Sequence, residues 1–167
     1  PTMHPALVNE LTHFAHERGI IITIETEGSH FVETDYPIDL LSLSPKFSNS
    51  VPVVGAVTPG GVTVDQKFVD IHNRKRMNTE AIKQMIDFHD DYHFKPVWDG
   101  TEGSLAEIEA YRVELNIPKN KTYIMPAGDT RETLIEMYPK VFDLCAEHGY
   151  NMTGRDHIIA FDTQRMV

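Results

Sequence analysis

The sequence predicts an α/β fold built mostly from parallel strands. Short runs rich in Ile, Leu and Thr alternate with longer amphipathic segments, in the order helix–strand–strand–helices–strand–helix–strand–helix–strand. Such alternation places helices on the outside of a parallel sheet. The length of 167 residues favours one domain, and no internal repeat or low-complexity segment is present.

The composition excludes several classes of function. A net charge of −10 disfavours non-specific nucleic-acid binding, which depends on Lys and Arg neutralising phosphates. No apolar run approaches the ~20 residues of a membrane span, and no leader peptide is visible. The single cysteine rules out an internal disulfide and fits a reducing compartment. We therefore expect a cytoplasmic protein without nucleic-acid or membrane partners.

The first third of the chain predicts one helix and two strands. A helix is expected over residues 5–18, with Pro5 in its first turn and Gly19 as its stop. Strands are expected at 20–25 and 40–44, where Ile, Leu and Thr are concentrated. The expected inner face of the helix consists of Leu7, Leu11, Phe14 and Ala15.

The segment at about 47–91 predicts a helical insertion, because it is long for a connection between two strands. A loop rich in Pro and Gly fills 46–62, and helices are expected at 63–76 and 80–90. The second of these helices should begin at a Thr79 cap. Its inward residues would be Ile82, Met85, Ile86 and His89.

The remainder predicts three further strands and two further helices. Strands are expected at 92–98, at 122–125 and at 157–161, although Pro96 weakens the first. Ser104 with Glu107 predicts a capping box for a helix to about residue 115, and Asp129 with Glu132 predicts a cap for a helix that ends at Gly149. The expected inner face of the last helix is Leu134, Ile135, Tyr138, Val141, Phe142 and Cys145.

The stretch from Ile20 to Lys46 carries the clearest candidate site. Its two apolar runs end at Glu25-Thr26-Glu27-Gly28 and at Ser44-Pro45-Lys46. Ligands of α/β folds lie at the carboxyl ends of the strands. The two strand ends would thus place a carboxylate, hydroxyls and an ammonium around one opening, which we call the mouth. Strands that merely enter polar turns, with a solvated lysine, would show the same pattern.

Other polar groups give weaker indications. The loop from Met125 to Thr130 leads from a strand into a helix, where backbone amides can bind an anion or an adenine edge, but an ordinary capped loop is the simpler alternative. The nine histidines form no recognisable metal motif, although His157 could point into the mouth. Cys145 lies on an apolar helix face and is interpreted as core.

Four motifs together resemble the C-terminal half of the radical S-adenosylmethionine enzymes of the 7-carboxy-7-deazaguanine synthase type. Pro1-Thr2-Met3-His4-Pro5 is similar to the end of the family's Gly-Gly-Glu-Pro segment. Ile-Glu-Thr-Glu-Gly at 24–28 and Leu-Ser-Pro-Lys at 43–46 resemble its strand ends. Tyr-Ile-Met-Pro-Ala-Gly at 123–128, followed by a helix and His157-Ile158-Ile159, resembles its final part.

The resemblance implies a partial (β/α) barrel of mostly parallel strands. It implies S-adenosylmethionine as cofactor, with His157 and Val167 facing the substrate, and it assigns no catalytic residue. The family's reaction converts 6-carboxy-5,6,7,8-tetrahydropterin to 7-carboxy-7-deazaguanine in queuosine biosynthesis. The implied cofactor-binding residues are Glu25, Thr26, Ser44, Pro45, Lys46, Met125, Pro126, Ala127 and Gly128.

The family also uses a [4Fe–4S] cluster and Mg²⁺, and here the chain departs from its pattern. The three cluster cysteines of the family lie upstream of the resemblance, and one cysteine cannot replace them. We therefore expect this chain to be the C-terminal part of a longer lyase, inactive by itself, and to form a homodimer through the edge of its first strand. A related activating enzyme and a non-catalytic nucleotide-binding module remain alternatives.

Overall fold

Two small parallel sheets form the centre of the protein. The computed structural model describes residues 2–58 and 60–164. One sheet has the order β1 (Thr23–Thr26), β2 (Leu40–Leu43), β3 (Tyr92–Phe94), and the other has the order β4 (Val97–Trp98), β5 (Tyr123–Pro126), β6 (Asn151–Met152). Every pairing within them is parallel. A parallel bridge between Phe94 and Thr122 joins the two sheets.

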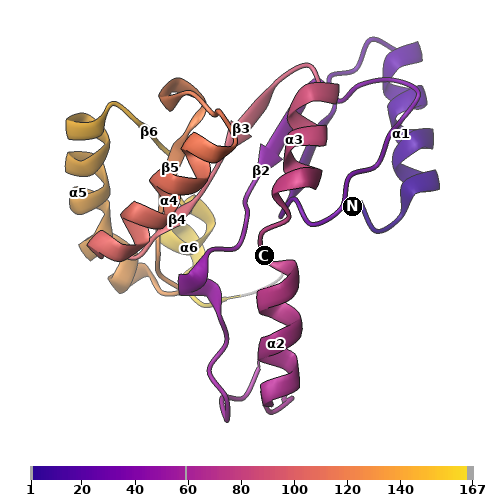
Figure 1. Ribbon diagram of the computed structural model, residues 1–167. Helices are drawn as coiled ribbons and strands as arrows, with labels where there is room; N and C mark the ends of the chain where they lie inside the picture. The colour runs from indigo at the N-terminus through magenta and orange to yellow at the C-terminus, as the bar shows by residue number, and fades with distance from the viewer. Residues whose placement is uncertain (1, 59, 165–167) are drawn as a thin grey trace.

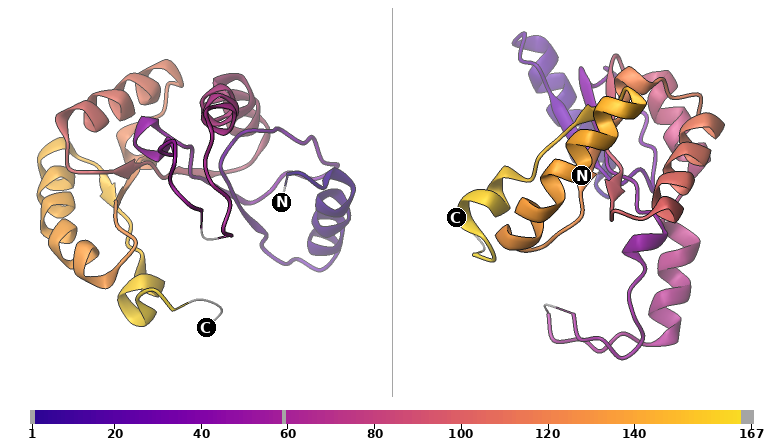
Figure 2. Two further views of the ribbon diagram at one scale, coloured as in Figure 1. Left: turned by 90° about the horizontal axis from the view of Figure 1, so that it is seen from below. Right: turned by 90° about the vertical axis from the view of Figure 1, so that its left-hand side faces the viewer.

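The helices lie along the outside of these strands. They are α1 (Pro5–Glu17), α2 (Gln66–Lys75), α3 (Thr79–Phe88), α4 (Glu102–Glu114), α5 (Arg131–His148) and α6 (Asp156–Phe161), with short 3₁₀ turns at Ser48–Ser50 and Lys119–Lys121. Figure 1 shows α2 extending away from the sheets, and the left view of Figure 2 shows the other long helices arranged along an arc. The parallel α/β architecture is confirmed, but the described residues form no closed barrel.

Strand alternation separates an apolar face from a polar one. In β1, Ile24 and Thr26 are buried while Thr23 and Glu25 are exposed. In β5, Ile124 and Pro126 are buried, whereas Tyr123 and Met125 are partly open. Successive side chains of a strand point to opposite faces, so one face packs under the helices and the other remains polar. The apolar face is completed by Leu41, Leu43, Phe94, Ile82, Met85 and Ile108.

The prediction of a final strand at 157–161 is wrong, because this segment is the helix α6. The last strand is β6, which pairs with β5 through Tyr123–Asn151 and Ile124–Met152. Gly149 ends α5 in the left-handed conformation as expected, with φ of 73°, and turns the chain straight into β6. A short apolar run such as His-Ile-Ile-Ala-Phe fits a helix or a strand equally well, so its pattern could not distinguish them.

Three other local predictions need correction. β1 begins at Thr23, so Ile20 and Ile21 precede it and are exposed. The third strand is interrupted at Lys95 and Pro96, because proline has no N–H for the ladder. The helix caps are Asn78, Thr101 and Thr130, rather than Thr79, Ser104 and Asp129.

The buried faces of α1 and α5 also differ from the expected ones. In α1 the buried residues are Val8, Thr12 and Ala15, while Leu7, Leu11 and Phe14 are exposed. This face is set by the loop before β2, where His16 stacks on Tyr36 and Asn9 donates a hydrogen bond to Asp35. In α5, Leu134, Val141 and Cys145 are buried as predicted, but Ile135 and Phe142 are exposed.

The segment 47–91 contributes to the body only in part. Ile82 and Met85 of α3 are buried in the main core. The antiparallel bridge Val57–Thr63 and α2 lie outside it (Figure 2, right). A homodimer joined at β1, which is an edge strand here, stays a prediction.

Leu134 and Ile135 provide a matched test of the core. Their exposed fractions are 0% and 58%, although they are neighbours in α5. We expect Leu134→Ala to lower the free energy of unfolding by about 2–5 kcal/mol, because it leaves a cavity. Ile135→Ala should change it by about 0.5 kcal/mol or less. Chemical denaturation measures both, and equal losses would contradict this packing.

Candidate functional site

A cavity opens at the carboxyl ends of the parallel strands. Its volume is about 600 Å³, within the range of small-molecule sites. Both acidic and basic side chains line it. The lining residues are Thr2, Met3, Glu25, Thr26, Glu27, Ser29, Ser44, Lys46, Lys95, Val97, Met125, Gly154, Arg155 and His157.

Six of the predicted site residues line this mouth cavity. Glu25, Thr26, Ser44 and Lys46 come from the ends of β1 and β2, and Met125 comes from β5. His157 also lines it, although from α6 rather than from a strand. The structure therefore brings these six residues around one cavity, while the binding role of each residue stays a prediction.

The remaining predicted residues divide into three groups. Pro45, Ala127 and Gly128 line an adjoining cavity of about 520 Å³, which shares Lys46, Val97 and Arg155 with the mouth cavity. Pro126 is buried in β5 and lines neither cavity. Val167 lies outside the described residues.

A lysine that no sequence motif indicates organises the polar face of the sheet. The Nζ atom of Lys95 donates to Glu25 Oε1 at 2.6 Å and to Ser42 Oγ at 2.9 Å. The hydrogen bond from Lys95 lowers the pKa of the Glu25 carboxyl, with burial opposing it and Ser42 and Lys46 contributing less. Lys95 directly precedes Pro96, where the strand is interrupted. This proline is the one local feature of the sequence that marks the position of Lys95.

The turn after β1 is formed by Thr26 and Gly28. The Gly28 N–H donates to Thr26 Oγ1 at 3.2 Å, and Gly28 has φ of +81°. A Cβ atom at this position would lie 2.8 Å from Ile82 Cγ1 of α3. Glycine is therefore needed both for the backbone conformation and for the close approach of α3 to the mouth.

Arg155 joins α6 to the β5–α5 loop. Its guanidinium donates to the Gly128 carbonyl, and its backbone N–H donates to Tyr138 Oη at 3.0 Å. Arg131 donates to the carbonyls of Ile159 and Ala160, which holds the C-terminal end of α6. No local pattern pointed to Arg155, since its partners lie far away along the chain.

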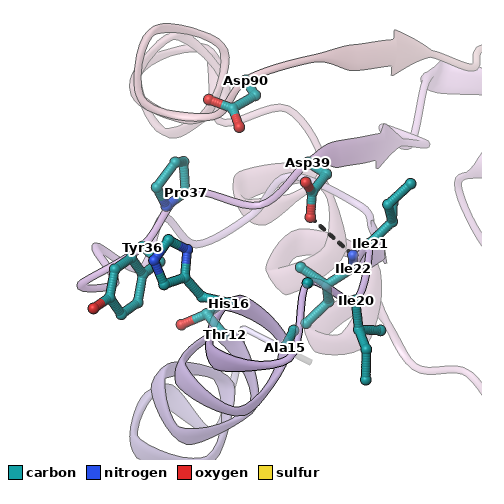
Figure 3. A pocket seen from close by; sticks show the side chains of 11 residues that line it. Thr12, Ala15, His16, Ile20, Ile21, Ile22, Tyr36, Pro37, Asp39 and Asp90 are labelled. Atoms are coloured by element: carbon teal, nitrogen blue, oxygen red, sulfur yellow. Dashed lines mark hydrogen bonds between the residues drawn. The ribbon is translucent and has the colours of Figure 1, made fainter.

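Another cavity lies at the amino ends of the strands (Figure 3). Its volume is about 320 Å³, and Ile22, Asp39 and Asp90 of its lining precede β1, β2 and β3. The Ile22 N–H donates to Asp39 Oδ2 at 2.9 Å, and His16 stacks on Tyr36. Because these polar groups hold local structure and ligands of parallel sheets bind at the opposite end, the mouth cavity is the stronger candidate.

The described residues contain no group of three or more His, Cys, Asp or Glu side chains that could hold a metal ion. Cys145 is buried, and its Sγ donates to the Asn151 carbonyl at 3.3 Å. Burial raises the pKa of this thiol to about 11, so it is a poor thiolate ligand. In the part of the chain that the structure describes, no helix is long and apolar enough to cross a membrane.

Fold and site together define an α/β protein with a charged cavity at the carboxyl ends of parallel strands. Sequence comparison adds a specific similarity. The chain is 29% identical over 164 residues to a 7-carboxy-7-deazaguanine synthase of Halobacterium salinarum, covering 95% of this chain and 60% of that protein. It is 29% identical over 147 residues to one of Rhodopirellula baltica, covering 88% of this chain and 53% of that protein.

These relatives confirm the resemblance inferred from the four motifs. The chain spans only 53–60% of their length. No family model matches the chain, and no solved structure matches it.

Gly28 gives a test of how the mouth is built. Gly28→Ala should destabilise the protein by about 1–2 kcal/mol for the left-handed backbone and by about 1–3 kcal/mol more for the contact with Ile82. Gly55→Ala is the control, since Gly55 has φ of +87° and an added Cβ there would meet no atom within 4 Å. Denaturation of both variants measures the difference, and equal losses would show that α3 does not press on this turn.

Proposed function

We propose that this chain is the cofactor-binding C-terminal part of a radical S-adenosylmethionine lyase that forms 7-carboxy-7-deazaguanine for queuosine biosynthesis. The observation that carries this proposal is a coincidence of motif and geometry. Motifs at 24–28, 43–46 and 123–128, which resemble those of the synthases, converge on two adjoining cavities. The similarity to two curated synthases over most of the chain supports the same conclusion.

The lining residues fit the chemical groups of S-adenosylmethionine. Lys46 is exposed at the junction of the two cavities and can bind the methionyl carboxylate as a point charge. The Ser44 hydroxyl can donate or accept a hydrogen bond with a ribose or amino group. The backbone from Met125 to Gly128 can bind the adenine edge. Glu25 and Thr26 lie on the cofactor side of the mouth, and His157 is the residue left for the pterin substrate.

The residues present do not fit the [4Fe–4S] cluster. Three thiolates are required by the family's pattern, and the chain has only Cys145, which is buried and already hydrogen-bonded. The described residues likewise offer no cluster of carboxylates for Mg²⁺. We propose that both groups are bound by other parts of the whole protein, and that this chain alone binds and orients without starting the reaction.

Lys46→Ala in the whole protein, reconstituted with its cluster, tests the proposal. We expect S-adenosylmethionine to bind at least about tenfold more weakly, because one charge-assisted contact is lost. Isothermal calorimetry measures binding, and chromatography of the product measures the conversion of 6-carboxy-5,6,7,8-tetrahydropterin.

Lys140→Ala is the matched control, since Lys140 is exposed on α5 away from both cavities. Binding without formation of 7-carboxy-7-deazaguanine would favour a related radical activating enzyme with another substrate. An unaltered protein that does not bind S-adenosylmethionine would overturn the proposal.

A further inference from the structure

Glu25 of β1, Ser42 of β2 and Lys95, which directly follows β3, share one face. Glu25 and Ser42 are register partners in β1 and β2, and Ser42 is the register partner of His93 in β3. Lys95 lies two residues beyond His93, so its side chain has the same orientation relative to the sheet. Its backbone N–H donates to the Leu43 carbonyl at 2.6 Å, which continues the ladder past the end of β3.

The contact between Lys95 and Glu25 is asymmetric. The Lys95 side chain is 17% exposed, whereas that of Glu25 is 68% exposed and lines the mouth cavity. Ser42 is buried and accepts from Lys95 at 2.9 Å, while its own hydroxyl lies 3.4 Å from Glu25 Oε1. The largely buried Lys95 ammonium therefore contacts side chains of β1 and β2, while the Glu25 carboxylate remains open to the cavity.

The two carboxylate oxygens of Glu25 have different roles. Both side-chain hydrogen bonds that Glu25 accepts, from Lys95 and from Ser42, go to Oε1. Within residues 2–58 and 60–164, no side chain donates a hydrogen bond to Oε2. An ionised carboxylate only accepts hydrogen bonds, so Oε2 is suited to an N–H or O–H donor.

Another ion pair in the same protein has a more enclosed geometry. Arg76 and Glu107 are each 19% exposed, and Glu107 also accepts hydrogen bonds from Ser48 through both of its oxygens. Both partners of that pair are thus enclosed and occupied. Exposed ion pairs contribute little to stability, so the open Lys95–Glu25 pair is poorly suited to a stabilising role alone.

We propose that Lys95 is a positioning residue of the mouth, which together with Ser42 holds Glu25 by one oxygen so that the other accepts a hydrogen bond from an N–H or O–H donor of the bound ligand. The inference rests on the proposed function only for the identity of that ligand. S-adenosylmethionine and 6-carboxy-5,6,7,8-tetrahydropterin both carry such donors, and they serve as the two probes.

Lys95 also affects the titration of Glu25. The hydrogen bond from Lys95 is the largest cause of the lowered pKa of Glu25. The other titratable or charged groups lining the cavity are Glu27, Lys46, Arg155 and His157. The lowered pKa means that Glu25 stays ionised to a more acidic pH. Without Lys95, Glu25 should become protonated sooner as the pH falls, and ligand binding should then be lost at a higher pH than in the unaltered protein.

The experiment compares Lys95→Met, Glu25→Gln and the double variant in the whole protein. Carbon-13 NMR of labelled glutamate carboxyls follows the titration of Glu25, whose signal is the one missing in Glu25→Gln. We expect Lys95→Met to raise its midpoint and to weaken one probe by about tenfold in calorimetry. The double variant should bind no more weakly than Glu25→Gln, since both changes remove the same positioned oxygen.

Lys121→Met is the matched control. Lys121 Nζ donates to Asp91 Oδ1 at 2.5 Å, and this hydrogen bond is the largest cause of the lowered pKa of Asp91. The pair lies next to the amino end of β3, away from the mouth cavity. Lys121→Met should therefore leave the Glu25 titration and the binding of both probes unchanged.

An unchanged Glu25 midpoint in Lys95→Met, or binding losses that add fully in the double variant, would overturn the inference. A loss of stability with unchanged probe binding would also overturn it, since the pair would then be structural only. If neither probe binds the unaltered protein, the proposed function fails, and the NMR midpoint alone decides whether Lys95 sets the state of Glu25. If Lys95→Met does not fold, Ser42→Ala replaces it, with a smaller rise of the same midpoint expected.

Discussion

The parallel register of β1 and β2 places Glu25 opposite Ser42, and the mouth depends on this ladder continuing across the sheets. Beyond the strand ends, the Ser44 N–H donates to the Thr26 carbonyl at 2.8 Å, and the Ala127 N–H donates to the Trp98 carbonyl at 2.9 Å. These bonds fix the strand-end loops at a common level. Polar residues far apart in the chain are thereby brought around one cavity, whereas a slip of one residue would turn Glu25 to the apolar face.

The third strand is interrupted at Lys95 and Pro96, but the hydrogen-bond ladder continues past this point. Proline cannot donate to the ladder, but its carbonyl still accepts from the Met125 N–H at 2.9 Å. The third strand therefore divides into β3 and β4 without losing its place between β2 and β5. Lys95 lies at this division, where its backbone pairs with Leu43 and its side chain reaches Glu25 and Ser42.

Much of the site could be predicted from short motifs because strand ends have strong local signals. Ile-Glu-Thr-Glu-Gly and Leu-Ser-Pro-Lys each combine an apolar run with a polar stop, and parallel strands place such stops at one edge. Lys95 and Arg155 could not be found in this way, since their importance comes from partners on distant elements, Glu25 for the one and Gly128 for the other. His157 lines the mouth cavity from α6, whereas the sequence pattern predicts it on a strand.

Local patterns were sufficient for the alternation of strands and helices, for the end of α5 at Gly149 and for the polar strand ends of β1 and β2. Each of these follows from interactions within a few residues, such as turn conformation and strand propensity. The buried faces of α1 and α5, the helical state of α6 and the pairing of Lys95 with Glu25 were decided by the tertiary structure. In those cases the local pattern allowed more than one outcome, and contacts between distant segments selected among them.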